Sequence, residues 1–294
     1  MISVVICTYN RSRSLRETLA SLAKMEAPAD LSWELVVVDN NSTDNTRAVV
    51  EEFGWTSGLK VQYVFEGQQG LAHARNAGVR AAKGEIIAFT DDDVYPQPNW
   101  LAVIWREFTA DPSLQVISGR VELLNPADLP ITIRRQSKRV VFQSLTDSFN
   151  VMVGCNAAVR RALFDRIGCF DVDLGTGSRF ESAEDSDFFF RAWRSGAKLV
   201  YEPSLFVFHD HGRRTQSAGV KVRRGYAVGR GAFYAKHLLK GNLLVLGAIR
   251  REVGWVLTAV LGHEGELGWR PLGWLLRGFF GYWRMRTVRR LLPT

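Results

Sequence analysis

The sequence predicts an α/β fold, in which a mostly parallel, doubly wound sheet carries helices on both faces and a basic helical tail follows. Three observations carry this prediction. Short apolar, β-branched runs alternate with segments of helical periodicity along residues 1–120. Polar clusters stand directly after three of these runs, at the strand ends where ligands bind in such sheets. The excess of positive charge is concentrated in residues 212–294.

The elements of residues 1–120 alternate regularly. The predicted strands are apolar, as parallel strands covered on both faces are; they are Ile2–Cys7, Trp33–Val38, Val61–Phe65, Glu85–Phe89 and Leu114–Gly119. The predicted helices repeat apolar residues three and four positions apart; they are Ser12–Lys24, a helix through Phe53 that Ser42 or Thr43 caps, Gly70–Ala82 and Pro98–Ala110. No GxGxxG or Walker-type sequence opens a helix, which argues against a Rossmann dehydrogenase or a P-loop enzyme.

The order of elements is less regular in residues 121–211. Residues 121–150 hold four clustered cations, and we expect them to form a partly mobile region near the site; the cations are Arg134, Arg135, Lys138 and Arg139. Two helices are predicted on either side of a glycine-rich loop; they are Arg160–Ile167 and Glu184–Ser195. Two short strands, Lys198–Tyr201 and Leu205–Phe208, then lead to His209 and His211.

Three adjacent carboxylates, Asp91, Asp92 and Asp93, follow the strand Glu85–Phe89. They repel one another, so each needs a cation, a hydrogen-bond donor or water. A hard divalent ion suits such a cluster because it prefers oxygen ligands. An isolated run of three acids is equally compatible with a solvated turn. Here, however, the clusters at 8–11 and 39–44 follow two other strands of the same sheet, which favours a ligand site.

Composition limits the class of protein. The chain has 294 residues, of which 46% are apolar, enough for one sizeable core and an appendage. Its three widely spaced cysteines fit a reducing compartment and show no zinc-ligand spacing. The start of the sequence resembles a strand rather than a secretory signal, so we expect a cytoplasmic protein.

The basic tail, residues 212–294, has 16 lysines and arginines against three acids, a net charge of +13. Segregated charge of this kind argues against a nucleic-acid-binding protein. Three helices are predicted in it; they are Lys221–Lys240, Leu243–Leu261 and Gly268–Val288. In the first helix, Tyr226 and Phe233 lie near one face, and Lys236 with three arginines lies largely elsewhere.

The middle helix of the tail carries Arg250 and Arg251 near its centre, which is too costly for an ordinary membrane span. Aromatic residues alternate with arginines in the last helix. We therefore expect these helices to lie on the surface of an anionic membrane. A helical subdomain or a homodimer interface through the same helices is the alternative.

The ordered set of motifs resembles family 2 of the inverting nucleotide-sugar glycosyltransferases, which have the GT-A fold. The motifs are VVICTYNR (4–11), VVVDNNSTDNT (36–46), GLAHARNAG (70–78), IIAFTDDD (86–93), GCNAAVRR (154–161), AEDSDFFFR (183–191) and PSLFVFH (203–209). Each motif alone is weak, whereas their order and spacing from residue 2 to about residue 211 are specific. The resemblance implies a GT-A domain over residues 1–211, with a nucleotide-binding half (1–120) and an acceptor and catalytic half (121–211), before the basic region 212–294.

The resemblance implies several donor-binding residues. Asp39 would accept a hydrogen bond from an imide N–H of the base, as in uracil, with a simple Asx-turn as the alternative. Arg75 would lie against the base or the diphosphate, with a surface cation as the alternative. The other implied nucleotide-sugar-binding residues are Thr8, Tyr9, Asn10, Arg11, Asp91, Asp92 and Asn156.

Asp91 and Asp93 match the DxD pair of the family, which would hold Mg²⁺ or Mn²⁺ on the donor diphosphate, and Asp92 can replace either. His209 is the implied third metal ligand, with His211 as a substitute. A packed or capping histidine is the alternative for His209.

Glu184–Asp185 matches the acidic pair of the family. The resemblance implies that Asp185 is the general base for the acceptor hydroxyl and that Glu184 orients groups or binds the acceptor. The alternative is that acids simply favour a helix N-terminus, which we prefer for Asp187. The loop 175–177 is expected on the acceptor side. Two departures stand out: Ala183 replaces a glycine often found there, and the QxxRW signature of processive synthases is absent, which favours single-sugar transfer.

The expected function is a metal-dependent, inverting, hexosyltransferase-type reaction. One sugar would pass from a nucleotide-diphosphate sugar, with UDP favoured, to a glycan or lipid-linked acceptor in surface polysaccharide assembly. The enzyme would act peripherally on the inner face of the cell membrane. One alternative is a sugar-nucleotide pyrophosphorylase, although TYNRSRS lacks the glycines of its loop. The other is a non-catalytic, membrane-associated scaffold, in which Asp185→Asn would change nothing.

Overall fold

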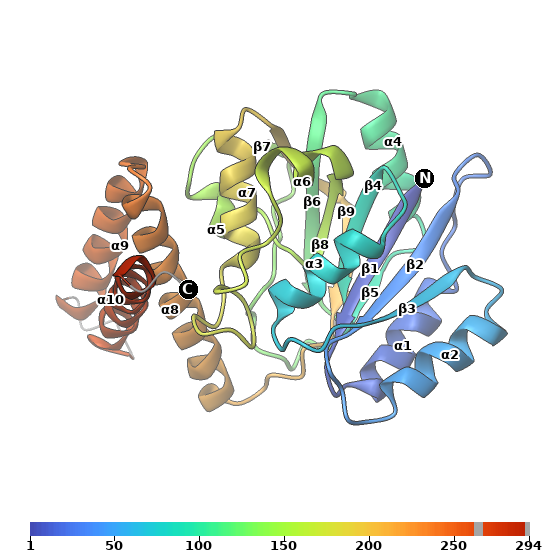
Figure 1. The fold of residues 1–294 in the computed structure, drawn as a ribbon, viewed down its shortest axis with the longest axis horizontal. Coiled ribbons are helices and arrows are strands. Elements are labelled where there is room, and N and C mark those ends of the chain that lie inside the picture. The colour runs from blue at the N-terminus through green and yellow to red at the C-terminus, as the bar shows by residue number, and fades with distance from the viewer. Residues whose placement is uncertain (262–266, 292–294) are drawn as a thin grey trace.

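A computed structural model describes residues 1–261 and 267–291 and contains one mixed β-sheet at its centre (Figure 1). The strand order is β3-β2-β1-β4-β8-β6-β9-β5, and β7 pairs with β9. The strands are β1 (Ile2–Thr8), β2 (Trp33–Asp39), β3 (Val61–Phe65), β4 (Ile86–Asp91), β5 (Val94–Pro96), β6 (Leu114–Leu123), β7 (Val140–Val141), β8 (Asn156–Arg160) and β9 (Lys198–His209). The predicted α/β class is therefore confirmed.

The helices cover both faces of the sheet. Those of the body are α1 (Ser12–Leu22), α2 (Thr46–Thr56), α3 (Leu71–Ala81), α4 (Trp100–Ala110), α5 (Asp147–Asn150), α6 (Arg161–Ile167) and α7 (Glu184–Arg194). Alternate residues of one strand feed two cores, because successive side chains point to opposite faces. Val4 and Ile6 pack with α1, α2 and α4, whereas Val5 packs with α3, α6 and α7.

The strand directions bring the predicted polar clusters to one edge of the sheet. Strands β1, β2, β3 and β4 are parallel, and Thr8 pairs with Asp39 while Cys7 pairs with Asp91. The sheet is more mixed than predicted beyond β4, since β8 is antiparallel to both β4 and β6. This edge, which we call the rim, therefore receives residues from both halves of the chain.

The two short strands predicted at 198–208 form one strand, β9. It runs parallel to β6 with a register shift between Gly119 and Arg120. The shift accommodates extra residues of β9, which press so closely that a Cβ on Gly119 would overlap the Leu205 carbonyl oxygen. A bulge thus replaces the predicted break.

The basic tail forms three helices, as predicted; they are α8 (Gln216–Leu239), α9 (Leu244–Leu261) and α10 (Arg270–Leu291). Helices α8 and α10 cross closely because Gly231 and Gly278 face backbone carbonyl groups of the other helix. None of the helices in the described ranges is long and apolar enough to cross a membrane. The tail gathers at one end of the molecule, with α8 against the body (Figure 1).

One prediction for α8 was wrong. Lys236 was placed away from the packed face of this helix, but it is 5% exposed and its Nζ lies 2.6 Å from carboxylate oxygens of both Asp171 and Asp187. His237, the next residue, bonds Asp187 as well. Buried ions are tolerated when they are paired, so these contacts tie α8 to α7 in the body.

Candidate active site

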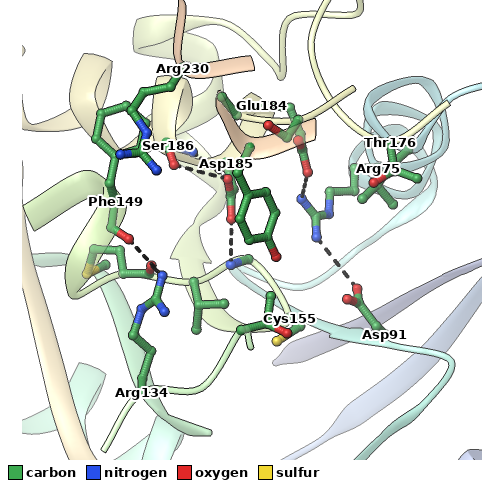
Figure 2. Close-up of a pocket in the computed structure, with 18 of the residues that line it drawn as sticks. Arg75, Asp91, Arg134, Phe149, Cys155, Thr176, Glu184, Asp185, Ser186 and Arg230 are labelled. Carbon is green, nitrogen blue, oxygen red and sulfur yellow. Dashed lines mark hydrogen bonds and ion pairs between the residues drawn. The ribbon is translucent and has the colours of Figure 1, made fainter. Parts of the chain in front are cut away.

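Two connected pockets lie on the rim. The first, which we call the rim pocket, has a volume of about 510 Å³ and lies beyond β1 and β4; it is lined by Thr8, Tyr9, Arg11, Asn40 and Asp91–Asp93, among others. The second, the acid pocket, has a volume of about 190 Å³ and lies at the N-terminus of α7 (Figure 2). Asp91, His209, Thr176 and Tyr226 line both. The two spaces can therefore hold two parts of one reaction.

Arg75 lines the acid pocket and contacts Asp91, which lines both pockets. It is 4% exposed, and its guanidinium lies 2.7 Å from Glu184 and 3.6 Å from Asp91 (Figure 2). Burial alone would lower the pKa of Arg75, but Glu184 and Asp91 outweigh it and raise that pKa further. Phe170 supports the guanidinium from 5.6 Å. Arg75 is thus a buried, fixed cation between two carboxylates, and the surface-cation alternative is wrong.

Asp185 is oriented by backbone N–H groups at the start of α7. The Gly154 N–H donates to its Oδ2 (2.9 Å) and the Ser186 N–H donates to its Oδ1 (2.7 Å). Its side chain stays partly exposed to the acid pocket. Ala183, two residues before Asp185, is the N-cap of α7 and has φ +78°. This left-handed conformation costs a non-glycine residue of the order of 1 kcal/mol. A glycine at position 183 would adopt this conformation without that cost, which explains why a glycine is often found there.

Glu184 is buried beside Asp185. Burial first, and the neighbouring Asp185 second, raise the pKa of Glu184 to about 7, while Arg75 acts in the opposite direction. Gly175 packs so closely that a Cβ there would lie 2.9 Å from Glu184 Oε2. The predicted loop 175–177 therefore lies against the acidic pair, and only glycine fits at its first position.

Arg11 holds two of the three adjacent carboxylates. It lies 3.0 Å from Asp92 and 2.8 Å from Asp93. Burial raises the pKa of Asp92 to about 7, despite Arg11 and a hydrogen bond from Thr8. Burial would also raise the pKa of Asp93, but hydrogen bonds from His209 and Arg11 hold it well below its usual range. Asp93 is therefore a permanent anion that is already fully engaged.

His209 and Asp91 retain capacity for a ligand. Nε2 of His209 faces Asp93 at 3.3 Å, whereas its buried Nδ1 has no partner in the described part of the chain. Asp91 is partly exposed to both pockets. No group of three metal-ligating side chains stands ready among the described residues. A cation that also binds ligand oxygens would nevertheless fit Asp91 and the free nitrogen of His209.

His211 cannot substitute for His209 as predicted. Its Nδ1 accepts the Arg213 N–H and its Nε2 contacts the Leu129 carbonyl, so both ring nitrogens are used. The ring also packs beside Asp128 at 3.4 Å. Its role is to fasten the chain that leads from β9 into the tail.

Three predicted binding residues lie outside both pockets. Asn156 is fully buried between strands, with its amide bonded to Trp100, Arg120 and Leu205. Asn10, with φ +52°, receives the Thr43 N–H and fixes the adjoining loop. Asp39 caps its own turn through Ser42 and accepts from Tyr63. Its neighbour Asn40 lines the rim pocket.

The helix caps and Asp187 also clarify the predictions. Neither Ser42 nor Thr43 caps α2; Asp44 accepts the Thr46 N–H instead.

Asp187 points away from the acid pocket toward Arg191, Lys236 and His237. These contacts hold the pKa of Asp187 well below the usual range, although burial alone would raise it. Asp187 is therefore a structural anion.

Sequence reasoning missed part of the pocket wall. The missed residues are Tyr226 and Arg230 of α8, whereas Arg134, which also lines the acid pocket, belongs to the cationic segment 121–150 that was expected near the site. Arg134 is held by the Phe149 carbonyl, as Figure 2 shows. Burial raises the pKa of Tyr226 to about 12, so it enters the pocket as a neutral phenol. Tyr226 and Arg230 stand four residues apart on one helix face, a signal that could have placed α8 at the site.

Two solved structures share this architecture. A mannosyltransferase from Pyrobaculum calidifontis, in complex with GDP-Man and Mn²⁺, covers 99% of this chain with a TM-score of 0.63 and 22% identity, over 86% of its own length. TarS from S. aureus (residues 1–349), in complex with UDP-GlcNAc, also covers 99%, with a TM-score of 0.56 and 20% identity, over 91% of its length. At these identities the similarity concerns the fold.

The central sheet with helices on both faces matches the GT-A fold of glycosyltransferase structures. The chain belongs to glycosyl transferase family 2, whose sequence model matches residues 3–168.

Curated relatives agree with this membership. Validoxylamine A glucosyltransferase from Streptomyces hygroscopicus subsp. limoneus is 38% identical over 40% of this chain, and chondroitin synthase from Escherichia coli is 27% identical over 71%. The chain spans 26% and 34% of these two longer proteins. Succinoglycan biosynthesis protein ExoM from Rhizobium meliloti is 27% identical over 78% of this chain and 73% of its own length.

Proposed function

We propose that the protein is a metal-dependent, inverting hexosyltransferase. It moves one sugar from a nucleotide-diphosphate sugar to a glycan or lipid-linked acceptor in surface polysaccharide assembly. The observation that carries the proposal is the orientation of Asp185, which two backbone N–H groups fix at the mouth of the acid pocket. Family membership and the Mn²⁺ and nucleotide-sugar complexes of the structural neighbours support it.

In this proposal Asp185 takes the proton of an acceptor hydroxyl. The acceptor oxygen attacks the anomeric carbon, and the bond from that carbon to the diphosphate oxygen breaks with its electron pair going to the nucleotide. A single displacement of this kind inverts the anomeric carbon. Arg75 links the acid pocket to the rim pocket, because it pairs with Glu184 in the acid pocket and with Asp91, which lines both.

Asp91 and His209 are the residues that would hold the divalent cation, Mg²⁺ or Mn²⁺. When bound, such an ion neutralises charge on the departing diphosphate. Asp93, predicted as a ligand, would instead orient His209 through Nε2, since Arg11 already engages it. Arg11 would add a cation beside the diphosphate.

Thr8, Tyr9 and Asn40 would line the nucleotide space, and Asp39 remains the proposed contact for the base. Each Asp39 oxygen accepts one hydrogen bond and has capacity for another. UDP is favoured because the Asp39 carboxylate can accept a hydrogen bond from the imide N–H of uracil. The thymine of dTDP carries the same imide N–H.

A thermal-shift panel tests the nucleotide and the metal together. We expect one of UDP, dTDP, GDP and CMP to raise the melting temperature in Mn²⁺ or Mg²⁺ but not in EDTA. A hundredfold excess over Kd stabilises the folded state by about 2.7 kcal/mol. Asp91→Asn should abolish the metal-dependent shift, while Asp165→Asn, an exposed acid on α6, should keep it. A folded protein that responds to none of the nucleotides would point to the scaffold alternative.

The acidic limb of the pH–rate profile tests Glu184. We expect donor hydrolysis to slow as the pH falls below about 7, because protonation of Glu184 breaks its ion pair with Arg75. Glu184→Gln lacks this ion pair at every pH, so its rate should be low and this limb should disappear. If the rate of Glu184→Gln still falls below about pH 7, a group other than Glu184 is responsible for the acidic limb.

A further inference from the structure

The C-terminal helices leave one mixed apolar and cationic surface uncovered. On α10, Leu276, Phe280 and Trp283 are 42%, 61% and 42% exposed, and their spacing places them on one side of the helix. Arg277 and Arg284, both exposed, flank them on that side. We call these five residues the α10 face. The opposite side of α10 is buried against the molecule through Leu275, Tyr282 and Met285.

Helix α9 and the residue before it show the same combination. Leu243 and Trp255 are 67% and 68% exposed, and Arg250 and Arg251 are exposed between them. Large apolar side chains scattered singly on a surface are ordinary, but here they recur on two neighbouring helices at one end of the molecule (Figure 1).

The cations of this surface have no acidic partners in the described part of the chain. The ion pairs of the tail involve other residues, such as Arg289 with Asp173. Glu252 on α9 turns inward and receives hydrogen bonds from Arg230 and Tyr234. The surface therefore presents arginines beside leucines and aromatic rings.

We propose that this surface binds an anionic lipid bilayer peripherally. Phe280 and Trp283 can enter the boundary between headgroups and acyl chains while Arg277 and Arg284 contact lipid phosphates. A second copy of the chain is a poorer occupant, because a two-fold interface built on one patch would bring like charges together. The described helices lie on such a surface rather than cross it, in keeping with their hydropathy.

The surface is structurally connected to the acid pocket. Arg230 lines that pocket and bonds Glu252 of α9, and Gly231 next to it packs on α10. Helix α8 thus forms the pocket wall on one side and supports the bilayer-binding helices on the other. If the proposed function holds, this arrangement presents the acceptor pocket to substrates carried in the membrane; bilayer binding itself does not depend on that function.

Vesicle sedimentation of the full-length protein tests the proposal. We expect the protein to pellet with vesicles of phosphatidylcholine and phosphatidylglycerol, and not with phosphatidylcholine alone. Binding should weaken in 0.5 M salt because the arginine–phosphate attraction is screened. The double variants Phe280→Asp/Trp283→Asp and Arg277→Glu/Arg284→Glu should each bind at least tenfold more weakly.

Matched controls lie on helices at the opposite end of the molecule in Figure 1. Trp55→Asp replaces an aromatic residue that is 82% exposed on α2, and Arg13→Glu/Arg47→Glu reverses two exposed charges on α1 and α2. Both should bind like the wild type, and all variants should keep its melting temperature. Equal losses in the controls, unchanged binding in the α10 variants, or equal affinity for neutral vesicles would overturn the proposal.

Two further outcomes separate this proposal from its rivals. If the protein ignores vesicles and forms a dimer that the α10 variants dissociate, the occupant is a second copy and the proposal is wrong. Donor hydrolysis measured without vesicles reports on the proposed function alone. A protein that hydrolyses donor but ignores vesicles contradicts only the bilayer surface, and one that binds vesicles without hydrolysis contradicts only the function.

Discussion

Replacing Asp185 by Asn is expected to lower the rate of sugar transfer, or of donor hydrolysis, by about 10²–10⁴-fold, the usual contribution of a general base. The amide cannot take a proton from the attacking hydroxyl. Its oxygen can still accept the N–H of either Gly154 or Ser186, so the fold should survive with a loss of about 1 kcal/mol. Steady-state kinetics with the donor, beside a urea titration, measures both effects.

The donor affinity provides the control for Asp185→Asn. Because Asp185 lies in the acid pocket and not in the rim pocket, the nucleotide-dependent thermal shift should remain. Asp165→Asn, at an exposed acid on α6 that lines neither pocket, supplies the comparison and should keep the wild-type rate. A rate for Asp185→Asn within a few-fold of the wild type would contradict the assignment of the base.

Asp187→Asn should instead lower the free energy of unfolding by about 3–5 kcal/mol. Asp187 is fully buried and receives Arg191, Lys236 and His237, so its neutralisation leaves buried cations without their partner. The exposed ion pair Arg289–Asp173 is the matched control, since Asp173→Asn should cost less than about 1 kcal/mol. Urea unfolding of both variants checks the difference.

The pH dependence of the Asp187 effect follows from its depressed pKa. The stabilisation is fully present above the ordinary carboxyl pKa of 3.8 and is lost as the pH falls toward the lower pKa of the folded state. The gap between wild type and Asp187→Asn should therefore be constant from about pH 5 to 8 and narrow in acid. A variant as stable as the wild type at pH 7 would show that α8 is not fastened to the body through this anion.

Much of the fold of residues 1–120 could be predicted because its signals are local. The apolar runs that form β1, β2 and β4 are followed at once by the polar residues of the rim. Because these strands pair in parallel, their C-terminal ends meet at one edge of the sheet. The short strand β8 could not be predicted, because its pairing is set by β4 and β6 far away in the sequence.

Individual site residues were harder to predict for the same reason. Asn156 belongs to a matching motif, yet its amide is saturated by three residues distant in sequence. Lys236 follows Phe233 by three positions and so shares its buried side, but Asp171 and Asp187, which make burial possible, are visible only in three dimensions. Helix α8 forms part of the wall of the acid pocket. The predicted domain boundary at residue 211 excluded this helix from the site.

The stereochemistry of donor hydrolysis tests the central claim most directly, and it needs no knowledge of the acceptor. The wild-type protein would be incubated in Mn²⁺ with UDP-glucose, UDP-N-acetylglucosamine and GDP-mannose, all α-linked, and the first free sugar followed by proton NMR before it mutarotates. A single displacement assisted by Asp185 predicts the β-anomer first, with little hydrolysis by Asp185→Asn. The α-anomer first, or equal hydrolysis by Asp185→Asn, would contradict an inverting transferase with Asp185 as its base.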